Sequence, residues 1–469
     1  MAHLCRLFFD HPRLVFLLYA LLFAAFHLIQ GEVCYFARTN IVTHECFDHA
    51  TGTSSRTGLF HGRNLSASSY SMSFVDAFFT ASEDTSRLCL VWLRTVDGAL
   101  SVYSPEYDCF DYRTSSQLNF SVAAGTYVNQ VMETEISPTG DSICAAVAGL
   151  DYGPSYPSAF SACVNGRQNT TSLFTYTDEI YSAPVLDMAT ALISSPAPYF
   201  FIAVLRGAPT TTGPAPHMNF SIYPMTTDLY PSRIYFEYLP GNITDIRLLT
   251  TPDQSKIIRV CAFENQTWLL DTYSAAQLPT IQSSRRTFTG SIYNLHVTTD
   301  SNYLCSIALS DIGGRLLHSL MCTSLADGSS NNFQVSGHLN PQTYAFLDVG
   351  LYNGVSSMCT WFATSPNATI SGKIACVRYE GFFNNISTPI DVPWNPYNAM
   401  EMFSTIPVLC ATMENSTGLM YGCFNFETRA TILTVRPLAT DLQMSILKHS
   451  TYVLLSLCLC MSQVWSYPS

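Results

Sequence analysis

The chain has 469 residues, of which 48% are hydrophobic and 12% are charged. This is enough apolar material for a large core or for several domains, and it excludes a disordered protein. Lys and Arg total 22 against 34 Asp and Glu, for a formal net charge of -12. Because no run of basic residues could follow a phosphate backbone, we do not expect a nucleic-acid partner.

The first element in the chain is a secretory signal over residues 1–31. Arg6 and Arg13 precede the apolar run "LVFLLYALLFAAFHLI" (14–29), and we expect cleavage near Gly31. A retained signal anchor is the alternative, because the apolar run is about as long as such segments become. The predicted mature region is a single ectodomain over residues 32–447.

Cysteines in the ectodomain fall into neighbouring pairs on strand-like runs, as in "SRLCLVWLRTVDGALSVYSPEYDCF" (86–110). The members of the six pairs are separated by 12, 20, 19, 17, 17 and 13 residues, enough for two strands and a turn. The pairs are Cys34 and Cys46, Cys89 and Cys109, Cys144 and Cys163, Cys305 and Cys322, Cys359 and Cys376, and Cys410 and Cys423. In an oxidising compartment such pairs predict six local disulfides, whereas zinc sites favour short CxxC spacings that the ectodomain lacks. Cys261 has no partner in this pattern.

The pairs repeat along the chain. Their first members are spaced by 55, 55, 161, 54 and 51 residues, and the long interval is three times the others. Two units therefore lack the pair, and strand runs stand in their places, "YFFIAVL" (199–205) and "KIIRVCAF" (256–263). Eight units of about 54 residues indicate an array or a propeller. Without their disulfides, the two exceptional units should be the softer part of the ectodomain.

A short apolar strand with an acid near its start precedes most of the cysteine strands. The acids are Asp76, Glu133, Asp187, Asp245, Asp348 and Glu401, and the unit before Cys305 has Asn294 or His296 instead. Turn residues follow in most units, as in "SPTGDS", "TPDQS" and "TTDSN". Each unit is thus predicted to have four antiparallel strands: the acidic strand, two cysteine strands and a weaker fourth strand.

The two ends of the ectodomain complement each other. The first unit begins at its cysteine hairpin (32–47), whereas "TDLQMSIL" (440–447) is an extra acidic strand that starts with Asp441. Joining the two ends in one sheet would remove exposed strand edges. We therefore predict an all-β, eight-bladed β-propeller of four-stranded antiparallel blades with disulfides inside the blades, closed by the N- and C-terminal strands. Seven blades is the alternative if the first hairpin only decorates the last blade. Separate immunoglobulin-like sandwiches would show distant cysteine pairs instead.

This pattern over residues 32–447 resembles, in architecture only, the β-propeller ectodomains of secreted and cell-surface proteins, of which the sema domain of semaphorins and plexins is the nearest in style. No sema motif can be transferred residue by residue. Sema propellers have seven blades and a cysteine-rich module behind them, which this chain lacks. The resemblance therefore implies a fold and not a guidance-receptor function.

Nine N-x-[ST] sequons support export and predict a glycosylated surface. They are Asn64, Asn119, Asn169, Asn219, Asn242, Asn265, Asn367, Asn385 and Asn415. Behind the ectodomain, residues 448–469 hold the apolar run "YVLLSLCLCMSQVW" (452–465), which is too short to cross a bilayer comfortably as a helix. It can be a removed GPI signal and so a membrane attachment, but its polar spacer is poor, and simple secretion is the alternative.

The acids of the first strands are the one group with candidate chemistry, because the innermost strand of a blade lines the central channel. Asp76, Glu133, Asp187, Asp245, Asp348, Glu401 and Asp441 can form a ring that binds a cation such as Ca²⁺ or a basic ligand, or an acid and base pair of the glycosidase kind. The simpler interpretation is that they accept hydrogen bonds from turn amides. We expect no other cofactor, and the sequence contains none of the common hydrolase or nucleotide-binding motifs. The prediction is a secreted or cell-surface glycoprotein that binds an extracellular protein or glycan, with a glycosidase-type hydrolase as the alternative.

Overall fold

The chain folds into antiparallel four-stranded sheets, as seen in a computed structural model. The structure describes strands between residues 32 and 447. Side chains are described mainly within residues 184–435, with gaps at many loops. The predicted signal (1–31) and tail (448–469) lie outside the described residues. Within the described part, no helix is long and apolar enough to cross a membrane.

The described strands make eight sheets, each with four strands. The first three sheets contain β1 (Glu32–Arg38), β2 (Val42–Asp48), β3 (Ser54–Leu59) and β32 (Asp441–Leu447); β4 (Ser73–Ser82), β5 (Thr85–Val96), β6 (Val102–Asp111) and β7 (Ser116–Ser121); and β8 (Tyr127–Ile136), β9 (Ser142–Leu150), β10 (Pro157–Asn165) and β11 (Thr170–Tyr176). The next two contain β12 (Val185–Ile193), β13 (Tyr199–Arg206), β14 (His217–Pro224) and β15 (Tyr235–Pro240); and β16 (Ile243–Thr250), β17 (Lys256–Phe263), β18 (Thr267–Ser274) and β19 (Ser283–Thr289).

The remaining three sheets complete the order along the chain. They contain β20 (Ser291–Val297), β21 (Tyr303–Asp311), β22 (Leu316–Ser324) and β23 (Ser330–Leu339); β24 (Ala345–Tyr352), β25 (Val355–Ala363), β26 (Gly372–Arg378) and β27 (Ile390–Val392); and β28 (Ala399–Met402), β29 (Val408–Asn415), β30 (Gly418–Asn425) and β31 (Ala430–Val435). A single 3₁₀ turn, Ala275–Gln277, follows β18 in the described part of the chain.

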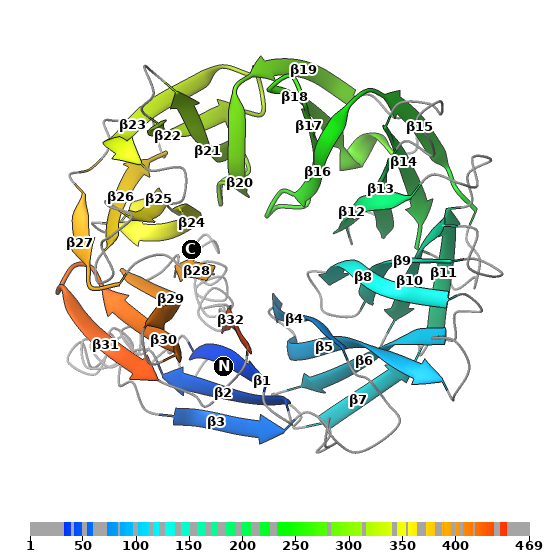
Figure 1. Ribbon diagram of the computed structural model, residues 1–469, viewed down its shortest axis with the longest axis horizontal. Helices are drawn as coiled ribbons and strands as arrows, with labels where there is room; N and C mark the ends of the chain where they lie inside the picture. The colour runs from blue at the N-terminus through cyan, green and yellow to red at the C-terminus, as the bar shows by residue number, and fades with distance from the viewer. Residues whose placement is uncertain are drawn as a thin grey trace, which may run out of the picture.

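The sheets are arranged around a common centre as the blades of a β-propeller (Figure 1). The first strand of each consecutive sheet lies toward the centre and the fourth lies at the rim. The N-terminal hairpin forms its sheet with the last strand, because β1 pairs with β2 on one side and with β32 on the other. The terminal strand β32 also contacts β4 and β28, the inner strands on either side.

Disulfides join the second and third strands within a sheet, as the sequence predicted. The four whose side chains are described are Cys144–Cys163, Cys305–Cys322, Cys359–Cys376 and Cys410–Cys423. In each pair the two cysteines are directly opposite one another in the register. Cys34 is likewise opposite Cys46, and Cys89 is opposite Cys109, although their side chains lie outside the described residues.

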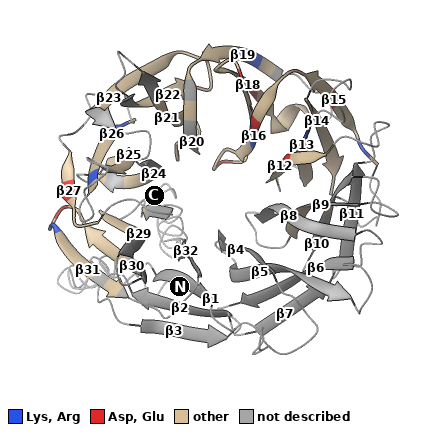
Figure 2. Cartoon of the chain, in the orientation of Figure 1, with Lys and Arg blue, Asp and Glu red and all other residues tan. Residues whose placement is uncertain are grey.

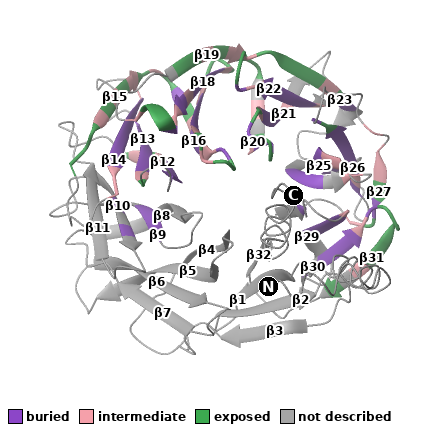
Figure 3. Cartoon of the chain, turned by 180° about the vertical axis from the view of Figure 1, so that it is seen from behind, coloured by how far each residue is buried: buried purple, intermediate pink, exposed green. Residues whose placement is uncertain are grey.

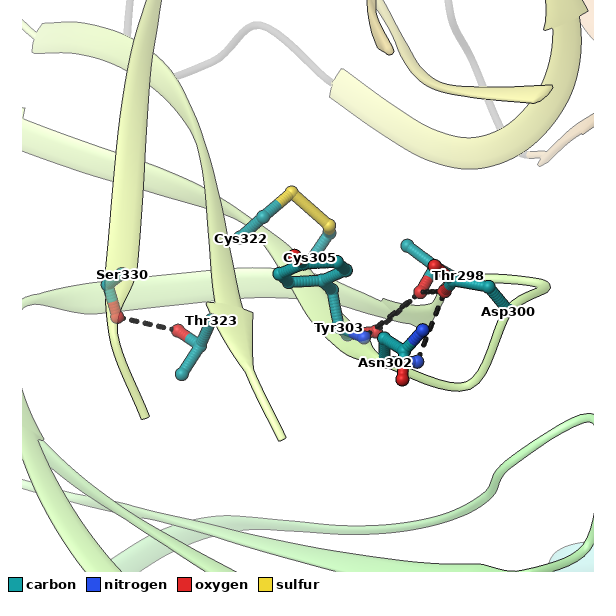
Figure 4. The surroundings of a disulfide bond; sticks show 8 residues. All are labelled: Thr298, Asp300, Asn302, Tyr303, Cys305, Cys322, Thr323 and Ser330. Carbon is teal, nitrogen blue, oxygen red and sulfur yellow. Dashed lines mark hydrogen bonds between the residues drawn. A yellow bond between two sulfur atoms is a disulfide. The ribbon is translucent and has the colours of Figure 1, made fainter. Parts of the chain in front are cut away.

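The same kind of tight turn connects the first and second strands in each of two neighbouring sheets. In the β16–β17 turn, Thr251 Oγ1 and Ser255 N–H both donate to Asp253 Oδ1, and Lys256 N–H donates to Thr251 Oγ1. Thr298, Asp300 and Tyr303 repeat the arrangement between β20 and β21, beside the Cys305–Cys322 disulfide (Figure 4). The "TPDQS" and "TTDSN" stretches are therefore structurally equivalent. They can be used to identify equivalent residues in the two sheets.

This equivalence identifies what replaces a disulfide in the β16–β19 sheet. Cys305 lies seven residues after Thr298, and Ile258 lies seven residues after Thr251. Ile258 is opposite Thr272, so these two residues occupy the positions of the cysteine pair. Cys261 is three residues farther along β17 and is a buried free thiol whose Sγ lies 3.6 Å from Met218 Sδ. It is therefore not the remaining half of a lost pair.

Candidate functional site

The predicted acids lie on the inner strands, but the register places them at different depths. Asp348 and Glu401 are opposite the first cysteines of their sheets, Cys359 and Cys410. His296 is opposite Cys305 in the same way. In contrast, Asp76 and Glu133 lie two residues before the residues opposite Cys89 and Cys144.

Asp245 lies four residues before the equivalent position in its own strand, since Leu249 is opposite Ile258. The acids therefore differ in their backbone position relative to the second strand of each sheet. The sequence analysis had aligned the acids by the apolar runs around them. Only the strand pairing shows that the acids occupy different positions along their strands. The side chains of Asp76, Glu133, Glu401 and Asp441 lie outside the described residues.

A strand irregularity precedes several of these acids. Pairing skips a residue immediately before Asp76, Glu133, Asp187 and Asp245, and the pairing of β20 is interrupted just before His296. Such bulges bend a strand and redirect the side chain that follows, and they are enriched beside functional sites. The bulge was not visible in the sequence, because a period-two pattern with one extra residue resembles a short apolar run.

Asp187 and Asp245 come together on the adjacent inner strands β12 and β16. Asp187 is half-buried and accepts a hydrogen bond from the Met188 N–H (2.9 Å), and Asp245 lies 3.2 Å from Arg247 Nη2. Burial raises the pKa of the Asp187 carboxyl, with a further contribution from the charge of Asp245, although Arg247 opposes both. The sequence analysis missed Arg247, whose position two residues after Asp245 puts it on the same side of the strand.

An exposed leucine lies at the same place. Leu186 occupies the bulge immediately before Asp187 and is 51% exposed. Leu186 and Asp187 are consecutive residues of the inner strand β12, and Asp245 and Arg247 lie on the adjacent inner strand β16. We call Leu186, Asp187, Asp245 and Arg247 the inner-strand cluster.

Asp348 is used differently, since it connects three neighbouring sheets. Its Oδ1 accepts from the Val349 N–H (2.7 Å) and lies 3.0 Å from His296 Nε2 on β20, while its Oδ2 accepts from the Met402 N–H on β28 (2.6 Å). Asp348 is 7% exposed. The fixed backbone donors and the neighbouring imidazole explain how a buried carboxylate is tolerated at this position.

The predicted cation site stays a prediction, because four of its seven acids have side chains outside the described residues. Within the described residues, no group of three or more His, Cys, Asp or Glu side chains is close enough to hold a metal ion. Charged residues are sparse on the described strands (Figure 2).

Among the predicted glycosylation sites, three have described side chains. Asn242 and Asn265 are exposed and line an open hollow of about 400 Å³ with Phe263 and Glu264. Asn242 Nδ2 donates to Glu264 Oε2, and Asn265 Oδ1 accepts from the Thr267 N–H. Asn219 differs, because it is 6% exposed within β14. The side chains of the other six sequon asparagines lie outside the described residues.

Comparisons with known proteins show a fold likeness only. No protein-family model and no curated protein matches the sequence. Among solved structures, Porphyromonas gingivalis dipeptidyl peptidase 4 is similar over 87% of this chain and 58% of its own, with 11% identity and a TM-score of 0.53. The WD40 domain of SCAP from fission yeast matches 80% of this chain and 90% of its own at 9% identity and a TM-score of 0.46.

The β-propeller domain of the Trilobed protease from Pyrococcus furiosus matches 75% of this chain and 92% of its own, at 10% identity and a TM-score of 0.39. At such identities, similarity transfers no activity. The chain also spans little more than half the length of the dipeptidyl peptidase. Nothing in these comparisons points to semaphorins or plexins.

Proposed function

We propose that this chain is an exported, N-glycosylated, closed eight-bladed β-propeller that binds an extracellular protein or glycan through the inner-strand cluster. Disulfides at matching positions of several sheets support folding in an oxidising compartment. The eight sheets and the β1–β32 pairing support the blade count and the closure. Attachment through a lipid-modified C-terminus remains part of the proposal as an alternative to free secretion.

The observation that carries the binding proposal is Leu186. Leu186 is 51% exposed at a bulge, immediately before Asp187 on the inner strand β12. Interfaces use such an arrangement, with an apolar anchor surrounded by polar groups that orient the partner. Arg247 and Asp245 would supply this orientation for a partner with complementary charges.

The test is a binding screen with the secreted full chain, displayed in multivalent form against arrays of extracellular proteins and glycans. We expect a specific ligand whose signal is lost in Leu186→Asp and in Arg247→Glu. Lys373→Glu, at a partly exposed side chain on β26, is the matched control and should keep the signal. A ligand that binds both cluster variants as well as the unchanged protein would refute this site.

A second candidate function is hydrolysis of a glycosidic bond, and the pKa of Asp187 favours it. A carboxyl whose pKa is raised beside a second carboxyl group is a feature of sites that use one carboxyl as an acid. Aryl glycosides of the common sugars would be the assay substrates. Turnover that disappears in both Asp187→Asn and Asp245→Asn supports this function, and absence of turnover above background in the unchanged protein argues against it.

A further inference from the structure

The turn between β17 and β18 carries one of the predicted glycosylation sequons. Most residues of the two strands are buried, whereas the three turn residues, Glu264, Asn265 and Gln266, are exposed. The labels β16, β18 and β19 locate this sheet in Figure 3. The Gln266 N–H donates to Phe263 O (3.0 Å), and Gln266 has a φ of 58°. This is the common three-residue hairpin loop, a type I turn followed by a residue in the left-handed region.

The hairpin register brings together the residues on either side of this turn. Ala262 is opposite Trp268. Phe263 and Thr267, one step closer to the turn, are therefore opposite each other. Asn265 Oδ1 accepts hydrogen bonds from the Thr267 N–H (3.1 Å) and from Thr267 Oγ1 (2.5 Å). Both bonds use the amide oxygen, so among the described residues the Asn265 Nδ2 atom has no partner. This nitrogen is the atom to which an N-linked glycan is attached.

Phe263 forms an apolar wall close to this nitrogen. Phe263 and Asn265 line the same open hollow of about 400 Å³, together with Glu264 and Asn242. The Phe263 ring packs against the core of the sheet and is only partly buried. Gly241 lies so close that a Cβ atom there would be 3.0 Å from Phe263 Cε1, and this close neighbour limits the movement of the ring. Phe263 therefore offers a fixed aromatic surface to a group that fills the hollow.

The hollow has the chemistry that a sugar ring needs. A pyranose has a face of C–H groups and an edge of hydroxyl groups, so its face packs on an aromatic ring, whose π surface is negative. The edge of the sugar forms hydrogen bonds with planar polar side chains. Glu264 Oε2 and Asn242 Nδ2 supply such groups at the hollow, where they are 3.1 Å apart. The volume also falls within the range of small-ligand sites, about 300–1,000 Å³.

The sequon at Asn242 opens onto the same hollow but is held differently. Its Nδ2 atom donates to Glu264 Oε2, and the hydroxyl of its Thr244 donates to Ala262 O. The nitrogen of Asn242 is thus directed at a carboxylate, whereas Asn265 is anchored through its oxygen and keeps its nitrogen available. Asn265 also lies in the same hairpin as the aromatic ring. We therefore assign the hollow to a sugar on Asn265.

We propose that the first N-acetylglucosamine of a glycan on Asn265 packs on the Phe263 ring and stabilises the closed β17–β18 hairpin. The inference rests on the export and N-glycosylation proposed above. In the next sheet the corresponding hairpin, β21–β22, is held by the Cys305–Cys322 disulfide. Opening β17–β18 separates the two ends of its turn and moves Phe263 away from Asn265, so the sugar contact is lost. The glycan therefore stabilises the tip of a hairpin that has no disulfide.

The test is a double-mutant cycle on the full secreted chain, with glycopeptide mass spectrometry to establish which asparagines carry glycans. Asn265→Gln removes the glycan, and Phe263→Leu removes the aromatic ring but keeps an apolar side chain. Asn265→Gln should reduce amide-exchange protection of β17–β18 about fivefold more in the Phe263 protein than in the Phe263→Leu protein. Loss of the hydrogen bonds from Thr267 occurs in both backgrounds and cancels. Asn242→Gln, which removes the neighbouring glycan, is the matched control and should show no coupling to Phe263.

The outcomes separate this inference from the proposed function. Equal effects of Asn265→Gln in the two backgrounds, with Asn265 glycosylated, overturn the sugar contact and leave export and glycosylation intact. Coupling of Phe263 to Asn242→Gln instead assigns the hollow to the other glycan and also overturns the inference. A chain that carries no glycan at any sequon overturns both the inference and the proposed glycosylation.

A second measurement needs no substitution, and so covers the case in which Phe263→Leu does not fold. Enzymatic trimming of every glycan to its first N-acetylglucosamine should leave the protection of β17–β18 unchanged, because only this sugar reaches the Phe263 ring. The same chain produced without glycans should lose protection there by about fivefold. If trimming alone lowers the protection as far as complete absence of glycans does, the outer sugars are responsible and the proposed contact is wrong.

Discussion

Two parts of the propeller connect the second and third strands of their sheets in different ways. In the sheets of β20–β23, β24–β27 and β28–β31, a disulfide connects the second strand to the third. The β16–β19 sheet has Ile258 and Thr272 at the equivalent positions, and one residue away Arg259 on β17 is opposite Asp271 on β18. A buried ion pair between these two side chains takes the place of the covalent link.

The ion pair is part of a network that crosses to the neighbouring sheet. Asp271 also accepts from Arg285 Nε on β19 (2.9 Å), and Glu237 on β15 contacts both Arg259 and Arg285. The Arg259 guanidinium lies over the Phe220 ring at 4.6 Å. A disulfide stabilises one sheet, whereas this network connects the β12–β15 and β16–β19 sheets. The sequence analysis had expected the two cysteine-poor sheets to be the softer part, and the experiments below test that expectation.

The largest expected effect comes from leaving a buried charge without its partner. Asp271→Leu removes the carboxylate that compensates Arg259, whose side chain is fully buried. We expect the free energy of unfolding to fall by about 3–5 kcal/mol, as for other broken buried pairs. The measurement is urea unfolding of the full chain.

Two further variants set the scale for Asp271→Leu. Lys373→Ala, which removes an exposed ion pair with Asp391, should change stability by less than about 1 kcal/mol. Combining Asp271→Leu with Arg259→Met should recover part of the loss, since the charge itself is then absent. If Asp271→Leu is no worse than Lys373→Ala, the network does not stabilise the two sheets.

A disulfide introduced into the β16–β19 sheet would compare the two kinds of link in one sheet. Ile258→Cys with Thr272→Cys places a cysteine pair at the position that Cys305 and Cys322 occupy in the next sheet. The new bond closes a loop of 14 residues and should add up to about 3 kcal/mol under oxidising conditions, less the loss of the buried Ile258 side chain. Comparing oxidised and reduced protein by thermal unfolding isolates the bond. An increase in stability as large as the decrease in the Cys305→Ala, Cys322→Ala double variant would show that a disulfide has the same effect at the two positions.

A smaller effect is expected at the junction of three disulfide-bearing sheets. Asp348→Ala removes the acceptor for the Met402 N–H and for His296, and should cost about 1–3 kcal/mol. Amide hydrogen exchange should rise around Met402 in β28 and leave β17 unchanged. Faster exchange in β17 instead would mean that the two regions are coupled through the ring.

The smallest expected effect is a loss of stability at low pH. Hydrogen bonds from Thr251 and Ser255 outweigh partial burial and hold the pKa of Asp253 at about 2, and Arg259 and Arg285 likewise outweigh burial to lower the pKa of Glu237. A carboxyl whose pKa is lowered by folding contributes stability above its unfolded pKa, and this contribution disappears as the pH falls through the folded pKa. Protection factors for amide exchange in β16–β19, which correct for the intrinsic pH dependence of exchange, should therefore fall between about pH 4 and pH 2. In Asp253→Asn this acid-dependent loss of protection should be smaller, and an identical pH profile would exclude Asp253 as its source.

Much of the architecture was predictable from the chain alone. Cysteines that recur with strand-like spacing predicted both the repeat and the cross-strand disulfides, because bridged residues must be opposite one another in a hairpin. The end strand at residues 440–447 was likewise recognisable as the missing partner of the first hairpin, since it repeats the inner-strand pattern. These features are local, and strand periodicity and covalent geometry are encoded over short stretches of sequence.

The candidate site and the stabilising network depended on the tertiary structure. A bulge changes which residue faces the channel, so the depths of Asp187, Asp245 and Asp348 follow from strand pairing and not from the spacing of acids along the chain. Glu237 and Arg259 lie 22 residues apart in different sheets, and no short-range pattern joins them. The sequence by itself determined the repeating strands and the disulfides, because both depend on neighbours in the chain. The partners of the charged side chains and the residues left exposed were decided only when the sheets packed together.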